Sequence, residues 1–258
     1  MLAGSRGESD PLAAIQGVGH RALLEVAGVP MLLRVLRSLE ATAGVGRLRV
    51  SIDDPAALDS VPELKARVNA GQLAPHRSLA SPSRSVLDAL AAHTDAPVLV
   101  TTADHALLTP EMAEHFLTRA SALEAHVCVG VVAQGVVEAR FPAVPRTWLP
   151  FRDARYTGAN LFVFRTPQAL RAVEFWIRAE SFRKKPWRIA STFGPLSLLL
   201  FALRRLTLDA ALARASKAIG CRIEAVRLPF AEAAVDVDRP SDLALAERVL
   251  SERLAAQD

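Results

Sequence analysis

The stretch Ala96-Pro97-Val98-Leu99-Val100-Thr101-Thr102 is a continuous apolar run that ends at Ala103-Asp104. A strand that is covered by helices on both faces of a parallel sheet has this uninterrupted character. Thr109-Pro110-Glu111 follows shortly after it. A capping threonine, a proline at the first helical position and an early acid predict that a helix begins there. These residues therefore predict a strand–turn–helix unit of an α/β protein.

Strand-like and helix-like segments alternate over the rest of the chain. Helices are expected at Pro30–Ala43, Ser85–His93, Pro167–Ala179 and Pro240–Ala256, and strands at Leu48–Ile52, Ala125–Val132, Thr157–Phe164, Cys221–Leu228 and Ala233–Val237. This alternation predicts a Rossmann-like three-layer α/β/α sandwich around a mostly parallel mixed sheet. We expect a single domain over residues 1–258, with an accessory helical region at about 182–218.

The composition limits the classes of function. A hydrophobic content of 51% is enough for a sizeable core, and a net charge of +4 suits small anionic substrates. This charge is not the dense basic stripe of a nucleic-acid-binding protein. Cys128 and Cys221 are predicted to be reduced thiols, because two isolated cysteines make no disulfide framework. We expect a cytoplasmic protein, since no signal peptide or transmembrane-length apolar run is seen.

The opening loop is a candidate anion site. Gly4 and Gly7 bracket Ser5 and Arg6 directly after Leu2-Ala3. Glycine lets backbone N–H groups come close to an anion, and the forked arginine cation suits phosphate. A second cation, Arg21, follows the long loop Glu8–Gly19. The two cations predict a triphosphate cradle, and a flexible terminus with solvated arginines is the alternative.

Three acidic residues are candidates for metal binding. Asp104 stands at the carboxyl end of a buried strand, where open α/β sheets bind ligands. Asp236 and Asp238 share one side of an extended segment and can approach one cation. Carboxylate oxygens are the hard ligands that Mg²⁺ prefers. The alternatives are a turn cap for Asp104, and a helix cap made by Asp238 or Ser241.

Three further segments carry polar or apolar signals. Ser81–Val86 places hydroxyls and Arg84 before a helix, which suits anion binding or a simple serine cap. Arg183–Arg188 holds four cations around a tryptophan and suits a phosphorylated or acidic-lipid substrate, or is a solvated charge run. Pro195–Leu203 is expected to pack in the core, with contact to a membrane surface as the alternative.

In this order the motifs resemble those of MobA-like and cytidylyltransferase-type nucleotidyltransferases, which share a glycosyltransferase-A-like fold. Leu2–Gly7 is similar to the Leu-Ala-Gly loop that wraps the nucleotide in this family. His20–Leu24 resembles the Pro-Lys-x-Leu-Leu element, with Arg21 in the lysine position. Ser81–Val86 is similar to the region that contacts base and ribose in cytidylyltransferases, and Val237–Leu243 resembles the closing Asp-Thr-Pro-Glu-Asp-Leu element.

The resemblance implies roles for individual residues. Nucleotide-binding roles fall on Leu2, Ala3, Gly4, Ser5, Arg6, Gly7, Arg21, Ser81, Arg84 and Ser85, and catalytic roles on Arg6, Arg21 and Asp104. The implied Mg²⁺ ligands are Asp104 and Asp238, assisted by Asp236. The acceptor is expected to meet Asn160, Lys184, Lys185 and Arg188.

The expected activity is Mg²⁺-dependent transfer of a nucleoside monophosphate from an NTP to a phosphorylated small-molecule or lipid-precursor acceptor, with release of pyrophosphate. The match at Ser85 favours CTP. One alternative is a glycosyltransferase of the same fold, which the position of Asp236-Val237-Asp238 near the C-terminus disfavours. The other alternative is a catalytically degenerate nucleotide-binding protein. Nucleic acid is not expected as a partner, and peripheral membrane contact is left open.

Overall fold

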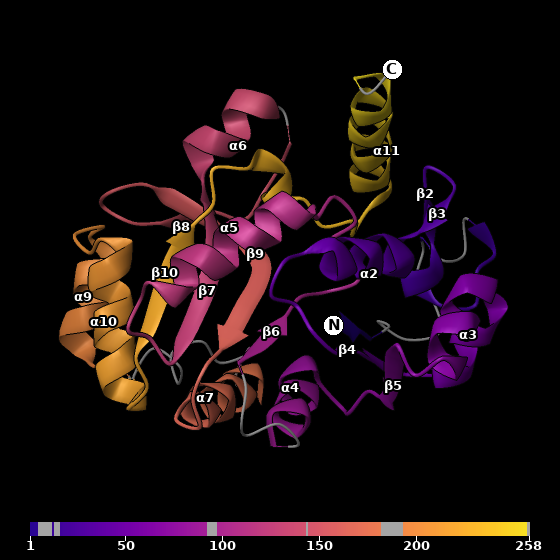
Figure 1. Ribbon diagram of the computed structural model, residues 1–258. Coiled ribbons are helices and arrows are strands. Elements are labelled where there is room, and N and C mark those ends of the chain that lie inside the picture. The colour runs from indigo at the N-terminus through magenta and orange to yellow at the C-terminus, as the bar shows by residue number, and fades with distance from the viewer. Residues whose placement is uncertain (5–11, 13–15, 92–96, 143, 182–192, 257–258) are drawn as a thin grey trace. The chain divides into compact units, whose positions relative to one another are not determined.

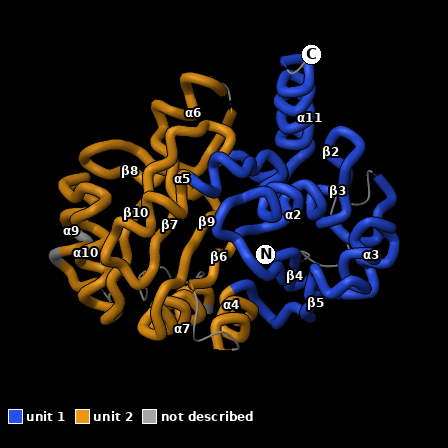
Figure 2. The backbone as a smooth tube through the Cα atoms, in the orientation of Figure 1, with its two compact units in different colours: residues 1–82, 101–114, 235–258 blue, residues 83–100, 115–234 orange. Residues whose placement is uncertain are grey.

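The computed structural model describes residues 1–4, 12, 16–91, 97–142, 144–181 and 193–256 (Figure 1). Contacts within the chain group it into two compact units (Figure 2). Unit 1 comprises Met1–Pro82, Thr101–Glu114 and Val235–Asp258, and unit 2 comprises Ser83–Val100 and His115–Ala234. The prediction of one domain over residues 1–258 stays a prediction.

Unit 1 is built on a parallel sheet of three strands in the order β1-β4-β5. The strands are β1 (Leu2–Ala3), β4 (Leu48–Ile52) and β5 (Leu73–Arg77). In β4, Leu48, Val50 and Ile52 are buried while the residues between them are partly exposed. This alternation confirms the predicted strand, because side chains of a strand point to opposite faces in turn.

Helices and turns complete unit 1. They are η1 (Arg21–Leu23), the hairpin β2 (Glu25–Val26) and β3 (Val29–Pro30), α2 (Met31–Ala41), η2 (Pro55–Ser60), α3 (Pro62–Asn69) and α11 (Pro240–Ala255). Ala27 and Gly28 both have positive φ, as the two-residue turn of a tight hairpin requires. On α3, Glu63 accepts hydrogen bonds from Arg37 of α2 and from Arg67.

Unit 2 is built on a mixed sheet in the order β10-β7-β9-β6, with β8 paired to β9. The strands are β6 (Val98–Val100), β7 (Val127–Ala133), β8 (Leu149–Pro150), β9 (Arg155–Phe164) and β10 (Ile223–Arg227). β10 runs parallel to β7, whereas β9 is antiparallel to β6, β7 and β8. These findings confirm a mixed α/β fold with parallel sheet elements.

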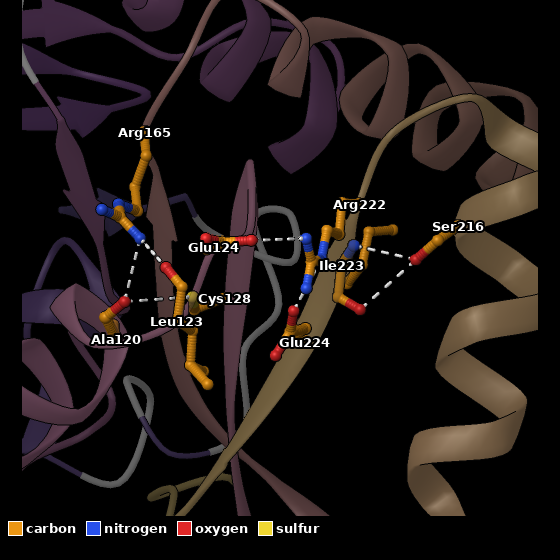
Figure 3. A network of polar contacts seen from close by, with 9 residues as sticks. All are labelled: Ala120, Leu123, Glu124, Cys128, Arg165, Ser216, Arg222, Ile223 and Glu224. Atoms are coloured by element: carbon orange, nitrogen blue, oxygen red, sulfur yellow. Dashed lines mark hydrogen bonds and ion pairs between the residues drawn. The ribbon is translucent and has the colours of Figure 1, made fainter.

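The helices of unit 2 are α6 (Gln134–Arg140), α7 (Ala169–Ser181), α9 (Pro195–Ala202), α10 (Leu208–Ile219) and the turn η3 (Ala231–Ala234), while α4 (Pro82–Ala91) and α5 (Pro110–Ser121) cross the unit boundary. Figure 3 shows polar contacts that join α10 and the end of α5 to the strands of the sheet. The hydroxyl of Ser216 on α10 accepts from the N–H of Ile223 at 2.8 Å. Arg165 donates to the carbonyls of Ala120 and Leu123, which closes the end of α5.

The pairing of β7 with β9 contains a bulge. Val129 pairs with Phe162 and Val131 with Gly158, so β9 has two extra residues between these points. Asn160 lies in this stretch with a φ of 47°, a left-handed conformation that asparagine tolerates better than most residues. A Cβ atom on Gly130 of β7 would lie 3.1 Å from Cβ of Leu161. A side chain at position 130 would therefore press on the bulged strand β9.

Two expectations from the sequence are wrong. The segment Ala233–Val237 is not a strand, because η3 occupies Ala231–Ala234 and the residues after it are irregular. Its small apolar side chains are buried around a turn, so the apolar pattern indicated burial and not an extended backbone. Pro195–Leu203 does not pack wholly in the core, since Leu199 and Leu203 are exposed.

Other expectations are confirmed. Cys128 and Cys221 are buried free thiols, and burial raises the pKa of both. Thr109 caps α5 by accepting from the N–H of Met112 at 3.3 Å. Within the described ranges, no helix is both long enough and apolar enough to cross a membrane.

Candidate functional site

The short strand β1 lies between two other segments of unit 1. The N–H of Leu2 donates to the carbonyl of Thr101 at 2.8 Å, and the carbonyl of Leu2 accepts from Ala103 at 2.8 Å. On its other side, the carbonyl of Met1 accepts from Ser51 at 2.9 Å. Both neighbours run parallel to β1. Gly4 and Asp104 therefore follow parallel segments at the same sheet edge, where α/β proteins bind ligands.

Arg21 connects the start of the chain to its end. The N–H of Ala22 donates to Nδ1 of His20 at 3.1 Å, which begins η1 and fixes the backbone of Arg21. The buried Arg21 guanidinium donates from Nη2 to the carbonyl of Val237 and to Oδ1 of Asp238, each at 2.6 Å. A buried cation needs both a counter-charge and hydrogen-bond acceptors, and this arrangement supplies both.

The three predicted metal-binding acids come into one neighbourhood. The N–H of Val237 donates to the carbonyl of Asp104 at 3.0 Å, which joins the segment after Thr101–Ala103 to the segment holding Asp236 and Asp238. One carboxylate oxygen of Asp104 and one of Asp236 are buried. The structure thus brings together, within unit 1, acids that are far apart in the sequence.

The start of α11 holds Asp238 in place. The carboxylate of Asp242 accepts from the backbone N–H groups of Asp238 and Arg239, at 3.3 and 3.0 Å. The capping role was predicted for Asp238 or Ser241, and these two bonds are made by Asp242 instead. Because Asp242 fixes the backbone of Asp238, the carboxylate of Asp238 is directed toward Arg21.

The donor atoms suit a magnesium ion that shares its ligands with a substrate. Asp104, Asp236 and Asp238 offer hard carboxylate oxygen atoms, and Oδ1 of Asp238 accepts from Arg21. Among the described residues, no three His, Cys, Asp or Glu side chains form a complete metal site. Mg²⁺ is commonly held by one or two carboxylates together with waters and substrate phosphates, which these residues fit. The magnesium site stays a prediction.

A polar cluster beside Gly4 was not predicted from the sequence. Nε2 of His20 lies 3.8 Å from Oδ2 of Asp53, and Oδ1 of Asp53 accepts from the hydroxyl of Ser78. A Cβ atom on Gly4 would lie 3.6 Å from the same Oδ1. Burial lowers the pKa of His20, and the Asp53 carboxylate opposes this shift. Asp53 directly follows β4, so its position at a strand end was the available signal.

His105, next to Asp104, is fully buried. Burial lowers its pKa to about 4, so the imidazole is neutral at pH 7. Arg21 is therefore the buried cation of this neighbourhood, and His105 contributes packing and no charge at pH 7.

The structure describes some of the remaining predicted site residues and leaves others out. Ser5, Arg6, Gly7, Lys184, Lys185 and Arg188 lie outside the described residues. The helix begins earlier than expected, because α4 begins at Pro82. Ser81 precedes it as predicted, whereas Ser83 and Ser85 lie within it and are buried. Ser83 donates to Oε2 of Glu180 at 2.5 Å. Arg84 is exposed and Ser81 is half-buried.

Solved structures that are similar to this chain include a relative and several proteins with a similar fold. A hypothetical transferase from Thermus thermophilus is 33% identical, with 94% of this chain and 96% of that chain covered and a TM-score of 0.76. A CMP:2-keto-3-deoxy-manno-octonic acid synthetase complexed with CTP is 15% identical, with 98% of each chain covered and a TM-score of 0.59. A 2-C-methyl-D-erythritol 4-phosphate cytidylyltransferase, also from Thermus thermophilus, is 18% identical, with 90% and 94% covered and a TM-score of 0.53.

A family model gives a match over most of the chain. The model of the MobA-like NTP transferase domain matches residues 2–218. A comparison with curated protein sequences gave no match. The two cytidylyltransferases share the fold, and the family model together with the 33% identical transferase establishes the family. The chain belongs to the MobA-like NTP transferase family and is a nucleotidyltransferase.

Proposed function

We propose that this nucleotidyltransferase moves a nucleoside monophosphate from an NTP to a phosphorylated acceptor in the presence of Mg²⁺. The observation that carries the proposal is the meeting of Arg21, Asp104 and Asp238 at the sheet edge that Gly4 follows. One buried cation and several carboxylates at the carboxyl ends of parallel strands suit a polyphosphate with its metal. This supports a site for a nucleoside triphosphate in unit 1.

In the proposed reaction, a phosphate oxygen of the acceptor attacks the α-phosphorus of the NTP. The new bond joins that oxygen to the α-phosphorus, the bond from the α-phosphorus to the bridging oxygen breaks, and pyrophosphate leaves with both bonding electrons. Such transfers depend on positioning and charge neutralisation more than on covalent chemistry by the protein. The chain must therefore supply fixed charges and donors around the phosphates.

Each residue has a proposed part in this task. Asp104 and Asp236 would hold the Mg²⁺, which neutralises phosphate charge when bound. Arg21, fixed by Asp238 and the carbonyl of Val237, provides a positive charge whose position does not change during the reaction. The backbone at Gly4 allows close approach of an anion, since glycine has no Cβ atom.

For the nucleotide we propose CTP, and for the acceptor we propose only a class of molecule. The match at Ser85 and the shared fold with a synthetase complexed with CTP support CTP as donor. The cationic residues Lys184, Lys185 and Arg188 support a phosphorylated acceptor, such as a sugar phosphate, a polyol phosphate or a phosphorylated lipid precursor. Reduced thiols and an NTP substrate suit the cytoplasm.

The test is a pyrophosphate-release assay with each of the four NTPs against a panel of phosphorylated acceptors, with and without Mg²⁺. Asp104→Ala should lower turnover by about a hundredfold or more, because a proposed ligand of the Mg²⁺ that neutralises phosphate charge is lost. Asp59→Ala is the matched control, since Asp59 is an exposed acid on η2 that lies 4.0 Å from Lys65. Circular dichroism would verify that both variants fold.

Three outcomes would contradict the proposal. Undiminished pyrophosphate release by Asp104→Ala would remove Asp104 from the site. Turnover of a nucleotide sugar without pyrophosphate release would favour a glycosyltransferase. Binding of NTP with no release on any acceptor would favour a catalytically degenerate nucleotide-binding protein.

A further inference from the structure

Exposed apolar side chains gather at the end of α9 in unit 2. Leu199, Phe201 and Leu203 are 56%, 38% and 55% exposed, and they are three of the six large exposed hydrophobic side chains among the described residues. Arg204 and Arg205 follow directly and are exposed. We call these five residues the α9 patch. Single exposed apolar residues are ordinary, but a group of them marks an interaction site.

The α9 patch rests on a packed base. The ring of Phe201 lies edge-on to the ring of Phe151, with centroids 5.7 Å apart. Arg214 of α10 donates to the hydroxyl of Ser197 at 3.3 Å, and Figure 1 shows α9 alongside α10. The N–H of Arg152 donates to the carbonyl of Leu206 at 2.8 Å, just beyond the patch. The apolar side chains are therefore presented by an anchored helix.

The surroundings of the α9 patch are cationic. Arg204 and Arg205 have no acidic partner within ion-pair distance among the residues that the structure describes. The acids of this region, Asp153 and Asp209, are instead paired with Arg227 at 3.6 and 2.9 Å. The two arginines therefore keep their charge uncompensated by the described part of the protein, beside exposed apolar side chains.

The backbone at Arg204 is a second, independent observation. Its φ is 53°, so it occupies the left-handed position that ends many helices. Glycine is the residue usually found there, because a side chain strains this conformation. Arg204 thus places a long cationic side chain at a strained position, directly after the exposed apolar side chains.

We propose that the α9 patch docks on the surface of an anionic phospholipid membrane. Leucine and phenylalanine side chains next to arginines combine apolar insertion with attraction to acidic head groups. At eight residues, α9 is too short to span a bilayer, so the helix would lie on the surface. This proposal does not depend on the reaction that unit 1 carries out.

A second copy of the chain fits the α9 patch less well. The three apolar side chains expose roughly 300 Å², whereas a stable interface buries about 800 Å² on each partner. A two-fold contact centred on the patch would also place Arg204 and Arg205 against their own copies, and like charges repel. The uncompensated positive charge instead matches a negatively charged surface.

Vesicle co-sedimentation of the full-length protein tests the proposal. The protein should bind vesicles of mixed phosphatidylcholine and phosphatidylglycerol, bind vesicles of phosphatidylcholine alone weakly, and dissociate as salt increases. Arg204→Gln and Arg205→Gln should each lower the partition coefficient about fivefold. Leu199→Ser and Leu203→Ser should each lower it about tenfold or more.

Leu254→Ser is the matched control. Leu254 is 63% exposed on α11, so the substitution changes an equally exposed leucine elsewhere, and binding should not change. Failure of the wild-type protein to sediment with anionic vesicles would overturn the proposal, as would an equal loss in the Leu254 variant. A concentration-dependent dimer that the Leu199 and Leu203 substitutions dissociate would overturn it in favour of self-association.

Discussion

The ion pair between Arg21 and Asp238 should respond unequally to loss of its two members. The Arg21 side chain is 7% exposed, whereas that of Asp238 is 36% exposed. Asp238→Asn removes a counter-charge from a buried cation. Arg21→Met removes the buried charge and leaves a carboxylate that water can reach, together with the unpaired carbonyl of Val237.

The two losses differ in magnitude. Removing one partner of a pair in which both groups are buried costs about 3–5 kcal/mol of stability. Solvent at Asp238 reduces the expected cost of Asp238→Asn to about 2–3 kcal/mol. A buried carbonyl left without its donor costs about 1–2 kcal/mol, which is the expected loss for Arg21→Met. The double variant should be no less stable than Asp238→Asn, so the coupling energy should be at least about 1–2 kcal/mol.

The assay must report on unit 1. Trp148 and Trp176, the two tryptophans within the described residues, lie in unit 2, so their fluorescence would not follow the loss of this ion pair. Native-state hydrogen exchange at the Ser51 amide, which is bonded to the carbonyl of Met1, would report the free energy of opening unit 1. A larger loss for Arg21→Met than for Asp238→Asn, or simple additivity in the double variant, would refute the reasoning.

Two more predictions concern stability. Gly130→Ala should lower the free energy of unfolding by about 1–3 kcal/mol, because the added Cβ would press on Leu161. The control Gly135→Ala on α6 has open space around its added Cβ and should be neutral or stabilising. Equal effects of the two substitutions in urea unfolding would contradict this prediction. Because burial lowers the pKa of His105 from 6.5 to about 4, the unfolded state binds more protons between these values. Stability should therefore fall by roughly 3 kcal/mol as the pH drops from 6.5 to 4, and His105→Leu should lose that part of the slope in urea titrations at several pH values. An unchanged slope would contradict the assignment.

Local patterns were enough to predict many elements of the fold. β4 has the predicted bounds Leu48–Ile52, and α11 ends one residue before the expected end, because periodicity and caps act over a few residues. The bulge around Asn160 could not be predicted, since it depends on the register between β7 and β9. The error at Ala233–Val237 has a similar cause, because a buried turn and a buried strand produce the same apolar run.

The candidate site was predictable only in part. The position of Asp104 at a strand end and the order of the motifs indicated which residues would meet. The pairing of Arg21 with Asp238, 217 positions later, could not be predicted, because no local pattern relates residues so far apart. An acid at the carboxyl end of a strand was the signal that indicated Asp104, and Asp53 after β4 has the same signal. Asp53 forms a polar cluster with His20 and Ser78 at the end of its strand.

The division of the chain has a consequence for its synthesis on the ribosome. Unit 1 is assembled from three separate segments, and the last of them, Val235–Asp258, follows the whole of unit 2. At about 5–20 residues per second, Asp238 is translated roughly 10–40 s after Arg21. The nascent chain thus carries the Arg21 cation without this counter-ion until the whole of unit 2 has been translated. The proposed phosphate site becomes complete only after Asp238 has been translated, so a chain released by a ribosome that stalls before this residue has an incomplete site.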